Sequence, residues 1–206
     1  MNLNENIANA VVVLQKTYES INKMLEQCRA ISESCGYILK SDKTLRWRSD
    51  VSTDGWLLNS LILVFQKNSD PDCLNNSGWK DGPVYAVQVF LGSAEESDLS
   101  AQLYVSRFDY ADINDGWTDE RLSPADHWAF YHPTHKVYSG FRFADKAGFA
   151  ESEPITEKYS QQYWGLKRAV WKTFPLSSVT ADNLRDMVFE TFNELEVLPW
   201  ELKKEA

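Results

Sequence analysis

Residues 7–31 read IANAVVVLQKTYESINKMLEQCRAI, and this stretch decides how the chain folds. Its apolar residues are separated by alternating steps of four and three, as in Ile7, Val11, Leu14, Tyr18, Ile21, Leu25 and Cys28. This spacing is typical of one face of an α-helix. A helix from about residue 5 to about residue 34 spans roughly 45 Å. Gly36 marks its expected end.

The flanks of this apolar stripe indicate what the helix packs against. With Ile7 at position d of a heptad, the g positions are mostly apolar and the e positions are almost uncharged. A two-stranded coiled coil usually carries opposite charges at e and g, whereas a helix on a globular core has a broader apolar face. The a, d and g face therefore favours packing on the protein's own sheet. An intermolecular helix pair is the alternative.

The rest of the chain predicts an α+β fold with a long N-terminal helix and a C-terminal helix packed on a mostly antiparallel sheet of five to seven strands. Alternating or wholly apolar segments predict strands, and a second helical pattern begins after Thr180. We expect a single α+β domain over residues 1–206. Its parts are a helix at 1–35, a sheet at 36–174 with long loops at 66–83 and 144–162, and a helix at 180–198. Within the sheet, the strands are expected at 36–40, 45–48, 57–65, 85–91, 101–110, 137–143 and 164–174, the first two as a hairpin.

Composition narrows the class of protein. The formal net charge of −9 disfavours general nucleic-acid binding, which needs a basic surface. The three cysteines form no C-x-x-C pair, so a reducing compartment fits. The N-terminus does not resemble a signal peptide, and no apolar run is long enough to cross a bilayer. These features predict a cytoplasmic protein without a membrane contact.

Charge is distributed unevenly along the chain. Residues 93–126 carry nine acidic and two basic side chains, whereas residues 136–174 carry seven basic and four acidic ones. Such an asymmetry can steer a partner with a basic surface. The candidate partner-binding residues are Asp109, Asp112, Asp115, Asp119 and Glu120.

All three histidines lie within nine residues, at His127, His132 and His135. Imidazoles are common ligands of transition metals, and three of them can leave one position open for water. Their spacing matches no zinc motif, and Pro133 keeps them off a single helical face. A divalent metal is the one cofactor that the sequence suggests, and otherwise none is expected.

Two classes of function follow. The chain contains no P-loop, dinucleotide-binding fingerprint or nucleophile elbow, which favours a non-catalytic binding protein. Such a protein would engage a protein partner through its acidic stretch and loops, and the first helix allows a homo-oligomer. The alternative is a metal-dependent hydrolase built on His127, His132 and His135.

Overall fold

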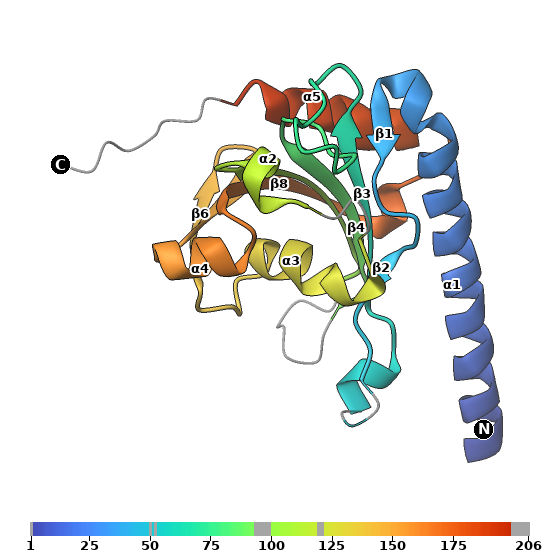
Figure 1. The fold of residues 1–206 in the computed structure, drawn as a ribbon. Coiled ribbons are helices and arrows are strands. Elements are labelled where there is room, and N and C mark those ends of the chain that lie inside the picture. Colours follow the sequence, from blue (N-terminus) through green and yellow to red (C-terminus); the bar gives the residue numbers. More distant parts are fainter. Residues whose placement is uncertain (1, 50, 52, 93–99, 119–121, 199–206) are drawn as a thin grey trace.

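The protein is built around an eight-stranded antiparallel sheet, seen in a computed structural model that describes residues 2–49, 51, 53–92, 100–118 and 122–198 (Figure 1). The strand order is β1-β3-β4-β5-β8-β7-β6, and β2 also pairs with β3. The strands are β1 (Tyr37–Leu39), β2 (Leu45–Arg46), β3 (Ser60–Lys67), β4 (Val84–Phe90), β5 (Gln102–Tyr110), β6 (Phe141–Lys146), β7 (Phe149–Pro154) and β8 (Leu166–Pro175).

Helices and short helical turns lie before, between and after the strands. The α-helices are α1 (Leu3–Ser32), α2 (Ile113–Gly116), α3 (His127–Tyr131), α4 (Glu157–Gln162) and α5 (Thr191–Glu196). A π-helical turn, η6 (Asp186–Glu190), leads into α5. The 3-10 turns are η1 (Glu33–Cys35), η2 (Thr53–Trp56), η3 (Pro124–Asp126), η4 (His132–Thr134) and η5 (Leu176–Ser178). Together these elements confirm the predicted α+β class.

Strand β4 lies in the interior of the sheet, and all seven of its residues are buried. Successive side chains of a strand point to opposite faces, so β4 supplies both cores at once. Val84 and Ala86 belong to one core, and Tyr85 and Val87 belong to the other. A strand buried on both faces needs a covering layer on each side of the sheet.

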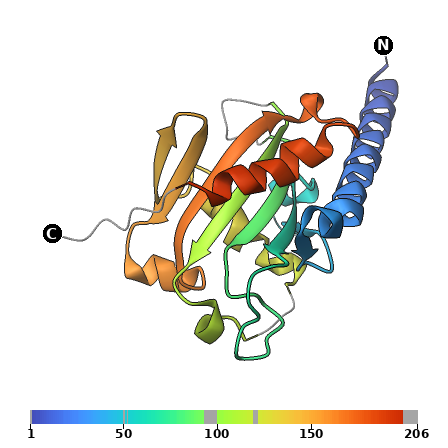
Figure 2. The ribbon, with the colours of Figure 1, turned by 90° about the horizontal axis from the view of Figure 1, so that it is seen from above.

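The first face is covered by α1 and by the η6–α5 helix. Figure 2 shows α5 crossing this face, with α1 at one side. The two helices contribute mainly aliphatic and aromatic side chains to the core: Ile21, Leu25, Cys28, Leu184, Val188, Phe189 and Phe192. Phe192 lies within 6.0 Å of the rings of Tyr37, Phe65 and Tyr85, measured between ring centroids. These contacts hold the C-terminal helix on the sheet.

The second face is covered by α3, by the loops around it and by the outer strands. Its core contains many large rings, including those of Trp79, Phe108, Trp117, Phe130 and Trp171. The rings of Phe108 and Phe130 meet edge to face at 5.3 Å, which fixes α3 over the sheet.

Cationic side chains hold the C-terminal end of α5. Arg107 donates from Nη1 to the carbonyl oxygens of Leu195 and Glu196, at 2.9 and 2.8 Å. Lys67 Nζ lies 2.6 Å from the Glu196 carboxylate. The last carbonyls of a helix lack intrahelical partners and carry partial negative charge, so both contacts stabilise this end.

Helix α1 begins at Leu3, slightly before the predicted start near residue 5, and its end near Gly36 is as predicted. Asn2 and Glu5 form a capping box, and Gly36 follows the 3-10 extension with a φ of 86°. Only the C-terminal part of the helix is buried, at Ile21, Leu25, Cys28 and Ser32. The N-terminal part extends past the edge of the core (Figure 1). The prediction of packing on the sheet is therefore confirmed for the C-terminal part of α1 only.

Two further details differ from the sequence-based prediction. Strands β1 and β2 do not form a hairpin with each other, because both pair with β3. Between β1 and β2, Lys40 N donates to the Val64 carbonyl at 2.8 Å, and Ser41 Oγ accepts from Val64 N. The chain therefore stays alongside β3 from β1 to β2. The final helical segment begins at Leu184 rather than at 180, after a turn in which Thr180 Oγ1 accepts from Asn183 N.

The predicted long loop at 144–162 is wrong. This segment contains the end of β6, all of β7 and helix α4. The turn between the strands contains Gly148 with a φ of 84°, a value that glycine adopts without strain. Strand β6 lies at the edge of the sheet and overlaps the strand predicted at 137–143. Most residues of β7 are half-buried, and its sequence lacks the apolar alternation that marks a strand. Within the predicted loop at 66–83, residues 68–83 form no helix or named strand and hold one isolated bridge, between Asp72 and Lys80.

Among the described residues, no helix is long and apolar enough to cross a membrane.

The unequal burial of α1 generates a prediction about stability. Leu25 is 2% exposed, so replacing it with alanine leaves a cavity and lowers the free energy of unfolding by about 3 kcal/mol. Val12 is 49% exposed on the opposite side of the helix, and Val12→Ala changes this free energy by less than about 0.5 kcal/mol. Urea unfolding of both variants measures the difference. Equal losses would show that α1 does not pack as described.

Candidate interaction surface

The three histidines lie close together on α3 and η4, but each one is hydrogen-bonded within the core of the second face. His127 Nε2 lies 2.7 Å from Ser60 Oγ, and His132 Nδ1 lies 2.6 Å from the Tyr163 hydroxyl. His135 Nδ1 donates to the Tyr131 carbonyl at 2.8 Å. Each of these bonds fixes the orientation of one imidazole ring through one of its two nitrogens.

Aromatic stacking fixes the imidazole rings further. The Tyr131 ring stacks on His135 at 3.7 Å and on His127 at 5.0 Å between centroids. The Tyr138 ring stacks on His132 at 3.6 Å. A ring that is stacked and hydrogen-bonded in this way is a packing element of the core.

Burial also keeps these histidines neutral. Desolvation lowers the pKa of His127 to about 3 and the pKa of His132 and His135 to about 4, from an ordinary value of 6.5. Among the described residues, no three His, Cys, Asp or Glu side chains come together in a geometry that could hold a metal ion. The metal site predicted at His127, His132 and His135 has no support in this arrangement.

One of the predicted acidic residues, Asp109, does not lie on the surface. Asp109 is buried, and Arg107 Nε and Nη2 both lie 2.8 Å from its Oδ1 atom. Burial raises the pKa of Asp109, and Arg107 opposes this rise. Asp112 is exposed, Asp115 lies in α2, and Asp119 and Glu120 lie outside the described residues. Asp109 is thus a structural ion-pair partner, while contact with a partner through the other four residues stays a prediction.

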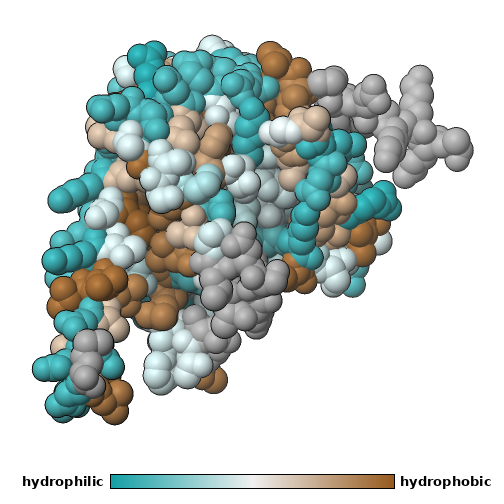
Figure 3. Space-filling model, turned by 180° about the vertical axis from the view of Figure 1, so that it is seen from behind, coloured by the Kyte–Doolittle hydropathy of each residue, from teal (hydrophilic) through white to brown (hydrophobic). Residues whose placement is uncertain are grey.

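The most prominent exposed apolar feature is the N-terminal part of α1. Leu3 is 70% exposed, Ile7 56% and Val11 59%. They continue into the half-buried Leu14 and Tyr18 with the same spacing as the buried residues of the helix. We call these five residues the N-terminal stripe. Figure 3 shows this end of the helix standing clear of the body, with hydrophobic side chains on its surface.

The N-terminal stripe carries no charge. The charged residues of this part of the helix, Glu5, Lys16 and Glu19, fall on other sides of it. Exposed apolar surface without charge is typical of a protein–protein contact.

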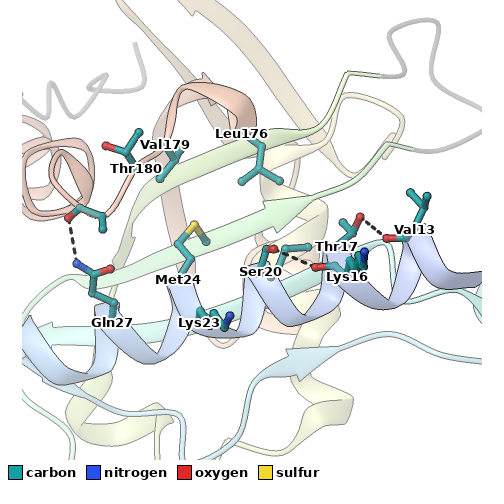
Figure 4. Close-up of a pocket in the computed structure, with 12 residues that line it drawn as sticks. Val13, Lys16, Thr17, Ser20, Lys23, Met24, Gln27, Leu176, Val179 and Thr180 are labelled. Atoms are coloured by element: carbon teal, nitrogen blue, oxygen red, sulfur yellow. Dashed lines mark hydrogen bonds between the residues drawn. The ribbon is translucent and has the colours of Figure 1, made fainter.

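A groove runs along a neighbouring side of α1. Its volume is about 570 Å³, and α1 forms one wall between Val13 and Gln27. The other wall is the connection from β8 to the C-terminal helix, at Leu176, Val179, Thr180 and Ala181. Figure 4 shows Met24 and Leu176 pointing into the groove from opposite walls.

The polar groups of the groove are mostly satisfied within the protein. Thr17 and Ser20 donate their hydroxyls to the carbonyls of Val13 and Lys16, at 2.9 Å in both cases (Figure 4). Gln27 Nε2 donates to the Ala181 carbonyl at 3.0 Å and closes one end. The groove walls therefore offer apolar surface and two ammonium groups, those of Lys16 and Lys23.

Sequence patterns alone did not locate the groove. The apolar g positions of the first helix were a signal, since Thr17 and Met24 line it. The opposite wall comes from residues about 150 positions later and forms only when β8 and α1 are brought together. Comparisons with protein-family models, curated proteins and solved structures found no match to this chain.

The depressed pKa values predict how the histidines respond to acid. In the unfolded chain these groups take up protons near pH 6.5, whereas in the fold they do so only near pH 3 to 4. Their contribution to stability is complete above about pH 6.5 and is lost as the pH falls toward about 4. We expect the urea midpoint to fall between about pH 7 and about pH 5. The raised pKa values of Asp70 and Asp109 act in the opposite sense and reduce this fall.

NMR titration separates these contributions. The ring-proton resonances of His127, His132 and His135 should stay constant from about pH 8 to about pH 5.5, since all three rings remain neutral. A histidine that titrates near its ordinary pKa would contradict the burial described for it.

Proposed function

We propose that this chain is a non-catalytic interaction protein that engages a protein partner through the N-terminal stripe of α1. The observation that supports the proposal is the exposure of Leu3, Ile7 and Val11 on a stripe whose continuation is buried in the core. The stability of a helix in a protein comes mainly from packing of its apolar face, so this segment gains from a partner that covers it.

A second copy of the chain is one partner that fits the stripe. If two N-terminal segments pair antiparallel about a two-fold axis between Ala10 and Val11, Ile7 of each copy faces Leu14 of the other. Ala10 of each copy then faces Val11 of the other close to the axis. Such a contact is self-complementary and closed, as a two-fold dimer requires. Residues 3–18 supply about 24 Å of helix for it.

The energy of this pairing is modest. Burying the exposed parts of Leu3, Ile7 and Val11 yields about 1–2 kcal/mol for each side chain. Over two copies the sum is about 6–12 kcal/mol, while association costs about 4–15 kcal/mol in lost freedom of motion. Self-association should therefore depend on concentration, with a dissociation constant in the micromolar range or weaker.

Adjacent valines provide a matched test of self-association. Val11→Glu places a charge in the stripe, and Val12→Glu places the same charge on the far side of the helix. We expect light scattering after size exclusion to show a concentration-dependent dimer for the unmodified chain and for Val12→Glu. Val11→Glu should be monomeric, because its carboxylate would be buried without a partner. A monomer for all three chains would remove the second copy as a partner.

Site-specific photo-crosslinking tests the broader proposal in extracts of cells that express the protein. A photoreactive residue at position 7 lies in the stripe, and one at position 9 lies on the other side of the helix. We expect one defined protein adduct from position 7 and none from position 9. The absence of an adduct at position 7, or equal labelling from both positions, would contradict the proposed surface.

The acidic stretch is a second proposed contact, for a partner with a basic surface. Asp112 is exposed and the chain is acidic overall. Changing Asp112 and Asp115 to lysine should weaken capture of such a partner, most at low salt, and leave self-association through α1 unchanged. Undiminished capture would restrict the interaction surface to α1.

A further inference from the structure

We propose that the groove between α1 and the β8–α5 connection binds a long-chain fatty acid, with its hydrocarbon chain along the groove and its carboxylate at Lys16 or Lys23. This site lies beside the N-terminal stripe and goes beyond the proposed protein contact. Its volume of about 570 Å³ falls within the range of small-molecule sites, about 300–1,000 Å³.

The shape of the groove favours a single hydrocarbon chain. From Val13 to Gln27 the helix rises about 21 Å. A volume of about 570 Å³ spread over this length makes the groove long and narrow, a shape that an extended hydrocarbon chain can follow.

The walls of the groove also disfavour an extended peptide. A bound peptide strand needs a row of unpaired backbone groups, as at the edge of a sheet. Here one wall is the side of α1, whose backbone groups are bonded along the helix. The other wall is a 3-10 turn and the residues after it. A hydrocarbon chain makes no hydrogen bonds and loses nothing on such a surface.

The charge of the groove indicates an anionic head group. Lys16 and Lys23 line it, and no acidic residue does. Within the described part of the chain, no ion pair involves either lysine, although the protein as a whole has a net charge of −9. The two lysines are seven residues apart and so lie on the same side of the helix, about 10 Å from each other along its axis. Either ammonium can meet a carboxylate while the chain lies against Met24 and Leu176.

Calorimetric titration of the delipidated full-length protein tests the site. The probes are palmitate, below the concentration at which it aggregates, and hexadecanol, which has the same chain length without the charge. We expect saturable binding of one palmitate per chain and weaker binding of hexadecanol. Equal affinity for the two probes would overturn the role of the lysines, and no saturable binding of palmitate would overturn the proposal as a whole.

Paired variants locate the binding. Ser20→Trp places a large ring in the groove at an exposed position, and Glu19→Trp places the same ring on α1 outside it. Ser20→Trp should abolish palmitate binding, and Glu19→Trp should retain it. Circular dichroism and urea unfolding verify that both fold. Equal palmitate affinity in the two variants would show that the groove is not the site.

Lysine variants test the head group. The double change Lys16→Gln and Lys23→Gln should weaken palmitate binding about fivefold, as expected for exposed ion pairs, and leave hexadecanol unaffected. Lys158→Gln, at an exposed lysine on α4, is the matched control and should have no effect. Binding of an acidic amphipathic peptide that Ser20→Trp abolishes and Glu19→Trp retains, without any binding of palmitate, would identify a protein ligand there and overturn the proposal.

Discussion

The complete burial of β4 is the constraint on which the rest of the structure depends. All seven residues of this strand are buried, and they alternate between two cores. A strand of this kind is stable only if both faces of the sheet are covered. The chain meets this requirement with α1 and the η6–α5 helix on one face. On the other face it uses α3, the outer strands and several tryptophan-bearing loops.

The two covering layers differ in chemistry. The helical layer is almost entirely apolar, whereas the layer around α3 contains buried polar groups such as Ser60, Gln88, His127 and Thr134. Gln88 Nε2 donates to Ser60 Oγ, which also bonds with His127. These groups are satisfied by one another, so they add directional bonds to a core built from rings. A clustered set of histidines is thus explained by packing.

Helix α1 is longer than the part of the sheet that it covers. The N-terminal stripe is exposed because of this difference in length. The apolar spacing is continuous from Ile7 to Cys28, but the sheet reaches only its C-terminal part. Beyond the sheet the same apolar side chains face solvent. Along the helix, the wall from Leu176 to Ala181 stands away from α1 and encloses the groove. One regular sequence pattern therefore yields a core contact, an exposed stripe and a groove wall.

The sequence by itself determined the long first helix, the α+β class and the strongly apolar strands β3, β4 and β5. These features depend on local periodicity, which acts within a few positions. Strand β7 was not predicted, because its sequence is too polar to show a period. The tertiary structure alone decided that Asp109 is buried against Arg107, that the histidines pack against tyrosine rings, and that α1 is covered over only part of its length. Each of these outcomes depends on contacts between residues distant in sequence or on the extent of the sheet, and neither can be read from local spacing.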